Sequence, residues 1–299
     1  MKTRTYTLPE PTAVELRLLR LLSGSGRLLA HWERFSNGEL FVSAAGVVDR
    51  TCVVARTYPP EENLVRSLLL VDTLRRNGSR DIRVILPYFA YGRQDEISEP
   101  GDALSAVFVA DQFRAAGASV VVSADVHNME ALRAAKVKVV DVPLAPVFAR
   151  VLRSGLKSDQ FTVVSPDEGG RPRAERLAKL LPGHPPVVHL KKHRQRFAGV
   201  RLLDFVGAPV GDTAVIVDDM VDTAGTLELA VGELRRRGFK RLFLCATHPI
   251  LSGPAVARLR RMRFARILFS DSIGLSPATA RLPGLKVVSC AEALASASR

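Results

Sequence analysis

The 299-residue chain has few cysteines, few aromatic residues and no long apolar run. Its three cysteines, Cys52, Cys245 and Cys290, are too widely spaced for a disulfide framework or a zinc motif, which favours a reducing compartment. No apolar segment approaches the length of a membrane span. Near the N-terminus, Arg17 and Arg20 interrupt the leucines, so no signal-peptide core is expected. We therefore expect a cytoplasmic protein with no membrane partner.

Basic residues exceed acidic residues and give a formal net charge of +13, which can indicate nucleic-acid binding. The arginines, however, recur through nearly every expected helix, as at 75–76, 235–237 and 258–261. No basic stripe is interleaved with stacking aromatic side chains. This pattern is typical of solvated helix faces, and a positive field also favours small anionic substrates. We expect no nucleic-acid partner.

Short apolar strands alternate with helices along the chain, and a hydrophobic content of 47% is enough for packed cores. This alternation predicts an α/β protein with mainly parallel sheets flanked by helices. A Pro-containing link near 142–145 divides it into domains 1–144 and 145–299. The expected strands are 51–56, 82–86, 119–123, 137–142, 161–164, 187–190, 214–217, 241–246, 265–269 and 286–288; the expected helices are 61–76, 103–116, 146–153, 173–181, 255–262 and one after 222.

The most informative stretch is 215–227, where an apolar strand is followed by an amphipathic helix. The carboxylates between them suit sugar hydroxyls or a hydrated Mg²⁺, and the turn offers N–H groups, hydroxyls and a helix N-terminus to a phosphate. Gly225 lets the main chain close around that phosphate. A pentose 5-phosphate fits this order better than an ordinary capped acidic turn does. The expected ligand residues are Asp218, Asp219, Asp222, Thr223, Ala224, Gly225 and Thr226.

This stretch resembles the phosphoribosyl-diphosphate fingerprint shared by type I phosphoribosyltransferases and ribose-phosphate diphosphokinases. The first group consumes phosphoribosyl diphosphate, and the second makes it from ATP and ribose 5-phosphate. Two upstream segments, 35–39 and 87–95, resemble ATP-binding segments of the diphosphokinases that the transferases generally lack. Taken singly, Phe35 would be interpreted as a core aromatic and Arg93 as a surface ion pair. Two matched segments at family-like spacing favour the diphosphokinases.

The two upstream segments suit a nucleotide chemically. Phe35 can stack on adenine, while Asn37 and Glu39 can hydrogen-bond to its edge. Arg93 supplies a rigid guanidinium for phosphates, with Gln94 as a neighbouring donor. The resemblance also gives His127, after the strand at 119–123, and Asp167, after the strand at 161–164, roles in Mg²⁺-nucleotide binding. The expected ATP-binding residues are Phe35, Asn37, Glu39, Arg93, Gln94, Asp95 and His127; the expected metal residues are His127, directly or through water, and Asp167.

A basic stretch at 191–196 follows the strand at 187–190. The resembled family carries a mobile Lys-x-Arg catalytic loop here, which Lys192 and Arg194 match, with Lys191 as the alternative register. Mobile cations that close over a triphosphate neutralise charge on the transferring group. The other interpretation is a solvated basic hairpin. Farther along, 246–255 resembles another family segment, in which His248 either borders the ribose site or has a structural role.

The resemblance runs from about Phe35 to Ala291. It implies two phosphoribosyltransferase-like domains, Mg²⁺, the substrates ATP and ribose 5-phosphate, and a homo-oligomer whose ATP site lies at a subunit interface. The implied reaction transfers the β,γ-diphosphoryl group of ATP to the anomeric hydroxyl and releases AMP. Residues 96–99 and 128–132 depart from the family pattern, so the resemblance does not extend to its regulation. The alternatives are a noncatalytic regulatory homologue and, third, a phosphoribosyltransferase.

Overall fold

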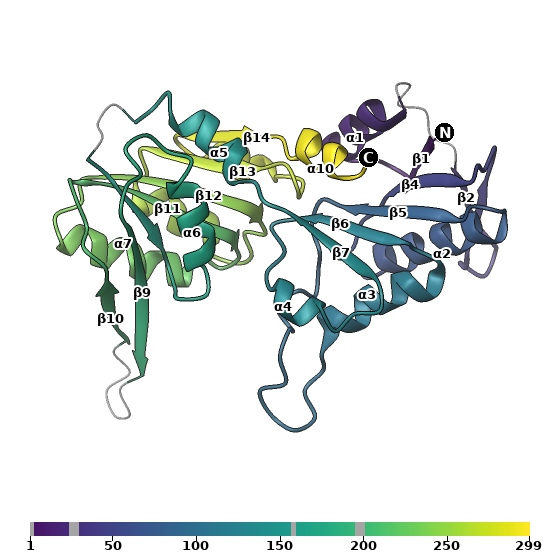
Figure 1. Cartoon of the computed structure of the whole chain (residues 1–299), viewed down its shortest axis with the longest axis horizontal. Coiled ribbons are helices and arrows are strands. Elements are labelled where there is room, and N and C mark those ends of the chain that lie inside the picture. The colour runs from purple at the N-terminus through teal and green to yellow at the C-terminus, as the bar shows by residue number, and fades with distance from the viewer. Residues whose placement is uncertain (1–2, 24–29, 157–159, 195–200) are drawn as a thin grey trace. The chain divides into compact units, whose positions relative to one another are not determined.

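A computed structural model describes residues 3–23, 30–156, 160–194 and 201–299. The chain forms two compact units (Figure 1): unit 1 is Met1–Pro143 with Ser289–Arg299, and unit 2 is Leu144–Val288. The sequence division at 144/145 left the C-terminal segment with the second domain, whereas its contacts place it in unit 1. The reason is that α10 (Ala291–Ala297) buries Leu294 and its alanine neighbours against α1 (Ala13–Ser23) and the first sheet.

Unit 1 is built on a five-stranded, entirely parallel sheet in the order β1-β4-β5-β6-β7. Its central strands are apolar on both faces because helices cover each side, as expected for a parallel sheet. In Figure 1, α1 and α10 lie on one face of this sheet, and α2 and α3 lie on the other. The strands are β1 (Thr3–Thr7), β4 (Arg50–Val54), β5 (Asp81–Leu86), β6 (Val120–Ala124) and β7 (Lys138–Val142).

Three further helices and a hairpin complete unit 1. The antiparallel hairpin of β2 (Ala30–Arg34) and β3 (Leu40–Ala44) packs on α2, where Arg34 pairs with Glu62. The short helix α4 begins at an asparagine cap, since the side chain of Asn128 accepts from the N–H groups of the first turn. The helices are α2 (Glu62–Arg76), α3 (Ser105–Ala116) and α4 (Met129–Leu132).

Unit 2 is built on a seven-stranded sheet in the order β10-β9-β8-β11-β12-β13-β14. All its pairs are parallel except β9 with β10, which form an antiparallel edge ribbon. The two central strands are the longest and have the most buried residues. The strands are β8 (Thr162–Ser165), β9 (Val187–Arg194), β10 (Arg201–Val206), β11 (Thr213–Val221), β12 (Arg241–Pro249), β13 (Arg266–Ser270) and β14 (Leu285–Val288).

The helices of unit 2 form two pairs, α5 with α6 and α7 with α8. Leu234 of α7 and Leu259 of α8 are buried against Ile216 and Leu244 of the central strands, so this pair closes the main apolar core. The helices are α5 (Ala145–Leu152), α6 (Arg171–Ala178), α7 (Gly225–Arg236), α8 (Ala255–Met262) and α9 (Pro277–Ala280). Each strand and helix expected from the sequence overlaps an observed one, and the predicted fold class is confirmed.

The sequence prediction missed several elements: β1, α1, the β2–β3 hairpin, β10 and the short helices α4, α9 and α10. Most of these elements are short, polar or at an end of the chain, so their periodicity is weak. The basic stretch at 191–196 also differs from the expected loop, because β9 continues through Arg194 and pairs there with β10. Residues 195–200, at and beyond the end of this stretch, lie outside the described residues.

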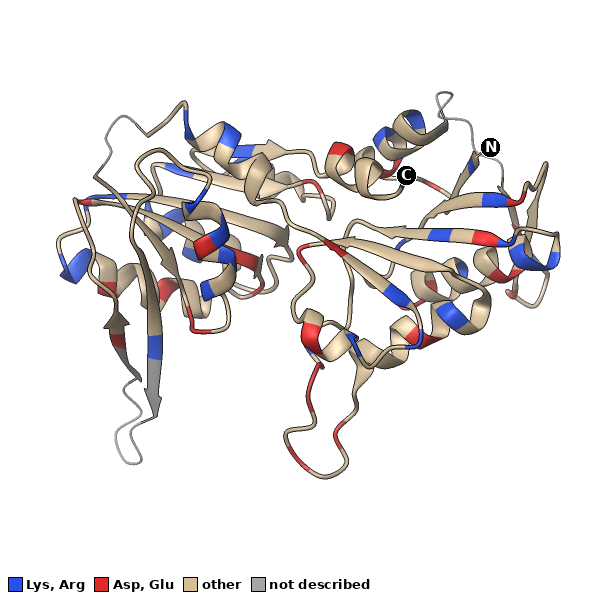
Figure 2. Ribbon diagram, viewed as in Figure 1, with Lys and Arg blue, Asp and Glu red and all other residues tan. Residues whose placement is uncertain are grey.

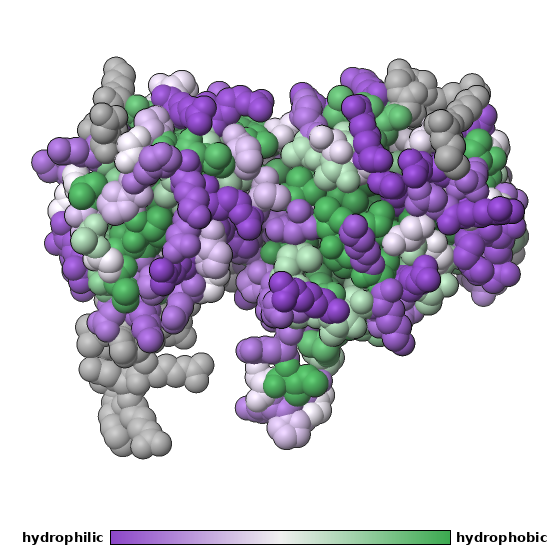
Figure 3. All heavy atoms as spheres, viewed as in Figure 1, coloured by the Kyte–Doolittle hydropathy of each residue, from purple (hydrophilic) through white to green (hydrophobic). Residues whose placement is uncertain are grey.

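The basic residues of both units are dispersed. Figure 2 shows Lys and Arg on many separate helices and strands, and Figure 3 shows hydrophilic side chains over much of the face it presents, interrupted by apolar areas. This is the distribution expected of solvated helix faces. Among the described residues, no helix combines the length and the hydropathy that a membrane crossing requires.

Candidate nucleotide and sugar-phosphate sites

The loops that follow the parallel strands carry the expected ligand residues, as is usual for α/β sheets. Four of these loops contain a non-glycine residue in the left-handed region: Tyr91 (φ 63°), Asp125 (φ 35°), Ala224 (φ 59°) and Leu251 (φ 56°). Such residues cost conformational energy and tend to occur where a ligand loop needs a particular shape. They follow β5, β6, β11 and β12, so backbone strain coincides with the segments singled out from the sequence.

The end of β11 brings two carboxylates together with a cation from α6. Asp219 is buried, and its Oδ1 lies 3.5 Å from Nη1 of Arg173, which is also largely buried. Asp218 is half-buried, and its Oδ1 accepts the N–H of Asp219 at 2.9 Å. The sequence prediction missed Arg173, because most of the longer helices carry arginines and only the packing of α6 beside β11 distinguishes this one.

The pKa of Asp218 lies well above its usual range. Loss of surrounding water is the main cause, followed by the charge of Asp219 and a hydrogen bond with the Asp219 side chain. Arg173 opposes the shift, and the charge of Asp167, at the end of β8, adds to it. Asp218 thus interacts electrostatically with two other carboxylates and with one guanidinium. The arrangement holds an excess of negative charge that sugar hydroxyls or a cation would stabilise.

Asp167 is held in place by its own loop. Its Oδ1 accepts the N–H of Gly170 at 2.9 Å, and its carbonyl accepts the Ser165 hydroxyl at 2.7 Å. A Cβ at Gly170 would lie only 2.5 Å from Ser165 Oγ, so this position requires glycine. The loop therefore fixes Asp167 at the carboxyl end of β8, next to β11 in the sheet.

The turn between Asp222 and Thr226 leads directly into α7. The residue before the helix, Ala224, is left-handed, and α7 has no side-chain cap on its first turn. The N-terminal N–H groups of such a helix are a ready anion site. The left-handed backbone therefore occurs at Ala224, and Gly225 is the first residue of the helix. A Cβ at Gly225 would make ordinary contacts, 3.5 Å from Arg258 Nη1 and 3.7 Å from Thr223 Oγ1.

This geometry gives a specific prediction for Gly225. Because a Cβ at this position would make only ordinary van der Waals contacts, Gly225→Ala should fold normally. Gly225→Val adds two further methyl groups, which would crowd Arg258 Nη1 and Thr223 Oγ1 and so disturb the turn that is expected to hold the phosphate. We expect Gly225→Val to weaken ribose 5-phosphate binding much more than Mg-ATP binding, with Gly225→Ala intermediate. Calorimetric titration of each ligand measures these affinities. Equal weakening of ribose 5-phosphate and Mg-ATP binding would contradict the placement of the 5-phosphate at this turn.

Of the expected ATP-binding residues, those of the 91–95 loop and His127 lie close together after β5 and β6. A Cβ at Gly92 would lie 3.7 Å from Cβ of His127, so the 91–95 loop passes close to that histidine. Nδ2 of Asn128 donates to Oδ2 of Asp95 at 2.8 Å, which joins the loop to α4. Arg93, Gln94 and His127 are exposed at this place. The sequence analysis predicted no role for Asn128, which both caps α4 and hydrogen-bonds to Asp95.

The hairpin segment 35–39 lies elsewhere in unit 1. In Figure 1 the β2–β3 hairpin lies beside α2, while α4 and the 91–104 loop lie at the opposite end of the unit. Phe35 is 56% exposed and makes an edge contact with Phe41, 5.8 Å between ring centroids. The side chain of Asn37 accepts the N–H of Glu39 at 3.1 Å, so it shapes the turn. Within one unit, the structure does not bring these residues next to Arg93.

The expected catalytic residues, Lys192 and Arg194, lie on the edge ribbon of unit 2. Their backbones pair with Leu203 and Arg201 of β10, and their side chains lie outside the described residues. Lys191, the alternative register, is exposed and pairs with Asp204. Their catalytic role stays a prediction.

His248 lies on β12 opposite Met220 and is buried. Its Nδ1 is 2.9 Å from the hydroxyl of Ser272, which itself donates to the Thr247 carbonyl at 2.9 Å. A histidine anchored in this way supports the end of β12. The contacts therefore favour the structural alternative for His248.

Among the described residues, no three His, Cys, Asp or Glu side chains converge to form a metal site by themselves. The two expected metal residues belong to different units, His127 to unit 1 and Asp167 to unit 2. The carboxylates of Asp167, Asp218 and Asp219 nevertheless provide the oxygen donors that Mg²⁺ prefers. Their mutual repulsion, seen at Asp218, fits a bound cation.

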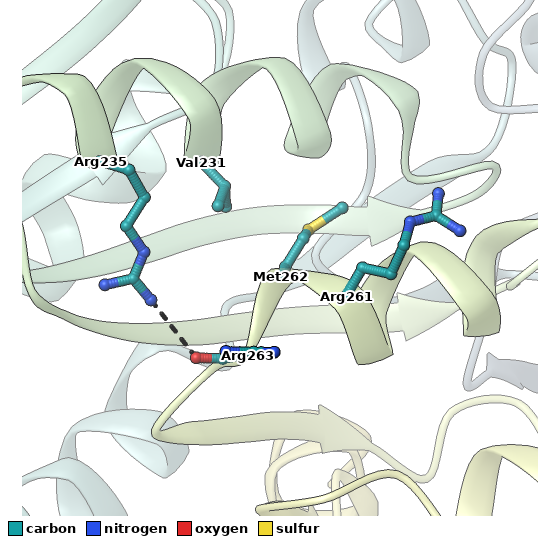
Figure 4. Close-up of a pocket in the computed structure, with 5 residues that line it drawn as sticks. All are labelled: Val231, Arg235, Arg261, Met262 and Arg263. Atoms are coloured by element: carbon teal, nitrogen blue, oxygen red, sulfur yellow. Dashed lines mark hydrogen bonds between the residues drawn. The ribbon is translucent and has the colours of Figure 1, made fainter.

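A cavity of about 580 Å³ lies between α7 and α8, away from the strand ends. Figure 4 shows its lining residues, Val231, Arg235, Arg261, Met262 and Arg263. The Arg235 guanidinium donates to the carbonyls of Phe239, Lys240 and Arg263, and Arg261 donates to Glu228. Because these guanidinium groups already hold main-chain or carboxylate oxygens, the cavity is explained by helix packing.

The protein has two mainly parallel sheets flanked by helices. In unit 2, carboxylates at the end of β11 are followed by a turn suited to a phosphate. Together these features define an α/β protein of the phosphoribosyltransferase-like class. Family comparison agrees and narrows this class. The N-terminal domain of ribose phosphate pyrophosphokinase matches residues 23–117, and the phosphoribosyl transferase domain matches residues 145–258. The chain belongs to the ribose-phosphate pyrophosphokinase family.

Individual relatives support this assignment. The chain is 33% identical to the ribose-phosphate pyrophosphokinase of Bacillus caldolyticus over 245 residues, 81% of this chain and 77% of that protein. It is 35% identical to that of Thermosipho africanus, over 81% of this chain and 78% of the relative. The crystal structure of phosphoribosylpyrophosphate synthetase from Mycobacterium smegmatis superposes with a TM-score of 0.86 at 28% identity, covering 100% of this chain and 98% of that chain.

Proposed function

We propose that this chain is a ribose-phosphate diphosphokinase, which transfers the β,γ-diphosphoryl group of ATP to the anomeric hydroxyl of ribose 5-phosphate. The observation that carries this proposal is that carboxylates at the end of β11 are followed directly by the turn that leads into the N-terminus of α7. One end suits hydroxyls and the other suits a phosphate. The family relationship supplies the donor, because the named relatives are pyrophosphokinases.

Each part of the site has a task in this reaction. Asp218 and Asp219 orient the ribose hydroxyls, with Arg173 holding Asp219 in place. The turn from Asp222 to Thr226 holds the 5-phosphate, so the anomeric oxygen is aimed at the β-phosphorus. The ribose oxygen attacks that phosphorus and AMP leaves. Catalysis rests on alignment and charge neutralisation, as in other phosphoryl transfers.

The nucleotide side completes the arrangement. Arg93 and Gln94 bind the triphosphate, and His127 lies beside that loop. Lys192 and Arg194 supply positive charge near the departing AMP oxygen. We assign Mg²⁺ binding to Asp167 with the β11 carboxylates in unit 2 and, separately and through water, to His127 in unit 1; bound Mg²⁺ would neutralise phosphate charge. Cytoplasmic placement remains part of this proposal, since the three cysteines are buried and form no disulfide.

The deciding experiment measures AMP formed from Mg-ATP with and without ribose 5-phosphate. We expect AMP and phosphoribosyl diphosphate in equal amounts, only when both substrates and Mg²⁺ are present. A noncatalytic homologue would bind the substrates without forming AMP. A phosphoribosyltransferase would instead consume phosphoribosyl diphosphate in the presence of a base. Either result would replace the proposal.

The separation of the hairpin from Arg93 supports a shared ATP site. The β2–β3 hairpin, which carries Phe35, packs on α2, whereas Arg93 belongs to the loop beside His127, so the stacking residues would come from a neighbouring subunit. The 56% exposure of Phe35 suits such a role. The protein would then be a homo-oligomer in which each ATP site lies at a subunit interface.

Mixing two inactive variants tests this arrangement. Asn37→Ala disables the hairpin contribution, and Arg93→Ala disables the phosphate contribution. If two chains form each site, a mixture of these variants should regain activity through hybrid sites, up to about a quarter of the wild-type value for random pairing in a two-chain site. A monomer that stays fully active at nanomolar concentration would exclude the shared site.

A further inference from the structure

Arg258 of α8 reaches the phosphate turn from the neighbouring helix. Its Nη1 donates to the Thr223 carbonyl at 2.9 Å, and its Nε lies 3.0 Å from Oε2 of Glu228 on α7. Its side chain is 29% exposed. One guanidinium thus joins three elements, the turn, α7 and α8, in a planar fork that a lysine cannot reproduce.

We infer that Arg258 is a positioning residue for the 5-phosphate of the ribose substrate. This inference rests on the proposed function and deepens it. The sequence prediction gave Arg258 no role, because it belongs to a run of arginines on a solvated helix. Only the contact with Thr223 distinguishes it.

The physical argument concerns the peptide between Thr223 and Ala224. In a planar trans peptide, the C=O and the N–H point in opposite directions. By holding the Thr223 oxygen, Arg258 therefore orients the N–H of Ala224 away from itself, and Ala224 immediately precedes the helix N-terminus that suits an anion.

The conformation of Ala224 makes such an anchor necessary. Its left-handed backbone (φ 59°) is unfavourable for a residue with a side chain and persists only where surrounding contacts hold it. The N–H of Glu228 donates to the Ala224 carbonyl at 3.0 Å, which fixes one side of this residue. Arg258 fixes the preceding peptide. Without it, the turn should sample shapes in which its N–H groups no longer converge on the phosphate.

Arg261 offers a matched control on the same helix. Its Nη2 donates to Oε1 of Glu228 at 3.1 Å, so it shares the carboxylate partner of Arg258. It is 64% exposed, and Figure 4 shows it extending away from Arg235. If Arg258 only ties α8 to α7, neutralising either arginine should have similar, small consequences. If Arg258 shapes the turn, the two variants should differ.

The test compares Arg258→Gln, Arg258→Lys and Arg261→Gln in the full-length protein. For each, the KM of ribose 5-phosphate, the KM of Mg-ATP and the thermal unfolding midpoint are measured. We expect Arg258→Gln to raise the KM of ribose 5-phosphate at least tenfold, the scale of one lost charge-assisted hydrogen bond, with the KM of Mg-ATP within twofold. Arg258→Lys should recover part of the loss, and Arg261→Gln should match the wild type.

A binding readout separates this inference from the proposed function. Ribose 5-phosphate should raise the unfolding midpoint of the wild type and of Arg261→Gln, but much less that of Arg258→Gln, whether or not AMP is formed. An inactive wild type would refute the function and leave this comparison intact. An active wild type with equal KM values in Arg258→Gln and Arg261→Gln would overturn the inference. If Arg258→Gln does not fold, a wild-type KM in Arg258→Lys would overturn it.

Discussion

Replacing Arg194 with alanine should lower kcat by about 10²–10³-fold, the usual cost of losing one preorganised charged donor in a transition state. Arg194 ends β9 in a polar, basic stretch with no apolar periodicity, so truncation should hardly change folding. Ribose 5-phosphate binding should stay close to that of the wild type, because the charge acts on the departing AMP. Steady-state kinetics and calorimetry on the same sample measure both effects.

The neighbouring residues supply the controls. Lys192→Ala should behave like Arg194→Ala, and the double variant should lose less than the product of the two factors if both act on one phosphate. Lys191→Ala should be near normal, because Lys191 is exposed one position earlier on β9. A loss of kcat in Lys191→Ala, but not in Lys192→Ala, would establish the alternative register. A normal kcat in the double variant would show that the basic ribbon has no catalytic role.

Asp218→Asn should raise the stability of the ligand-free protein and strongly lower the activity of the enzyme. In the wild type, burial and the charge of Asp219 hold the pKa of Asp218 well above its usual range, so its ionised form is unfavourable in the folded state. Asparagine removes that cost while keeping the shape. It also removes a charged acceptor for the ribose hydroxyls, which should reduce kcat/KM for ribose 5-phosphate by about 10- to 100-fold.

The sign of the pH dependence follows from linkage. A carboxyl whose pKa is raised on folding binds its proton more tightly in the folded state. The wild type should therefore lose stability as pH rises above the ordinary aspartate range, up to the raised pKa of Asp218. The variant lacks this loss, so the difference between their unfolding midpoints should be small in acid and grow toward neutral pH. Thermal unfolding in magnesium-free buffer from acid to neutral pH measures it.

Asp212→Asn is the matched control for this prediction. Asp212 precedes the same strand, is exposed and lies 3.6 Å from the Nζ of Lys240. Its replacement should change neither the activity nor the pH dependence of stability appreciably. An Asp218→Asn protein less stable than the wild type at neutral pH would mean that the carboxylate is satisfied in the ligand-free state. The site would then lack the excess charge on which its ligand binding is argued.

The sequence by itself determined the alternation of strands and helices and the order of the ligand segments. Val215–Val217 predicts a buried strand because apolar β-branched residues have no other stable place, and the carboxylates that follow must then lie at its carboxyl end. Local chemistry is enough for such statements. It is also enough for the turn before α7, since the sequence from Asp222 to Thr226 carries its donors with it.

Only the tertiary structure decided which distant residues join these segments. Arg173 and Arg258 cannot be told from the other arginines by pattern, because their roles depend on the packing of α6 and α8 beside β11 and α7. The same holds for Asn128, whose partner Asp95 is 33 residues away. The backbone conformation of the turn was also beyond the sequence, because alanine does not favour the left-handed region and only the contacts of the folded chain hold Ala224 there.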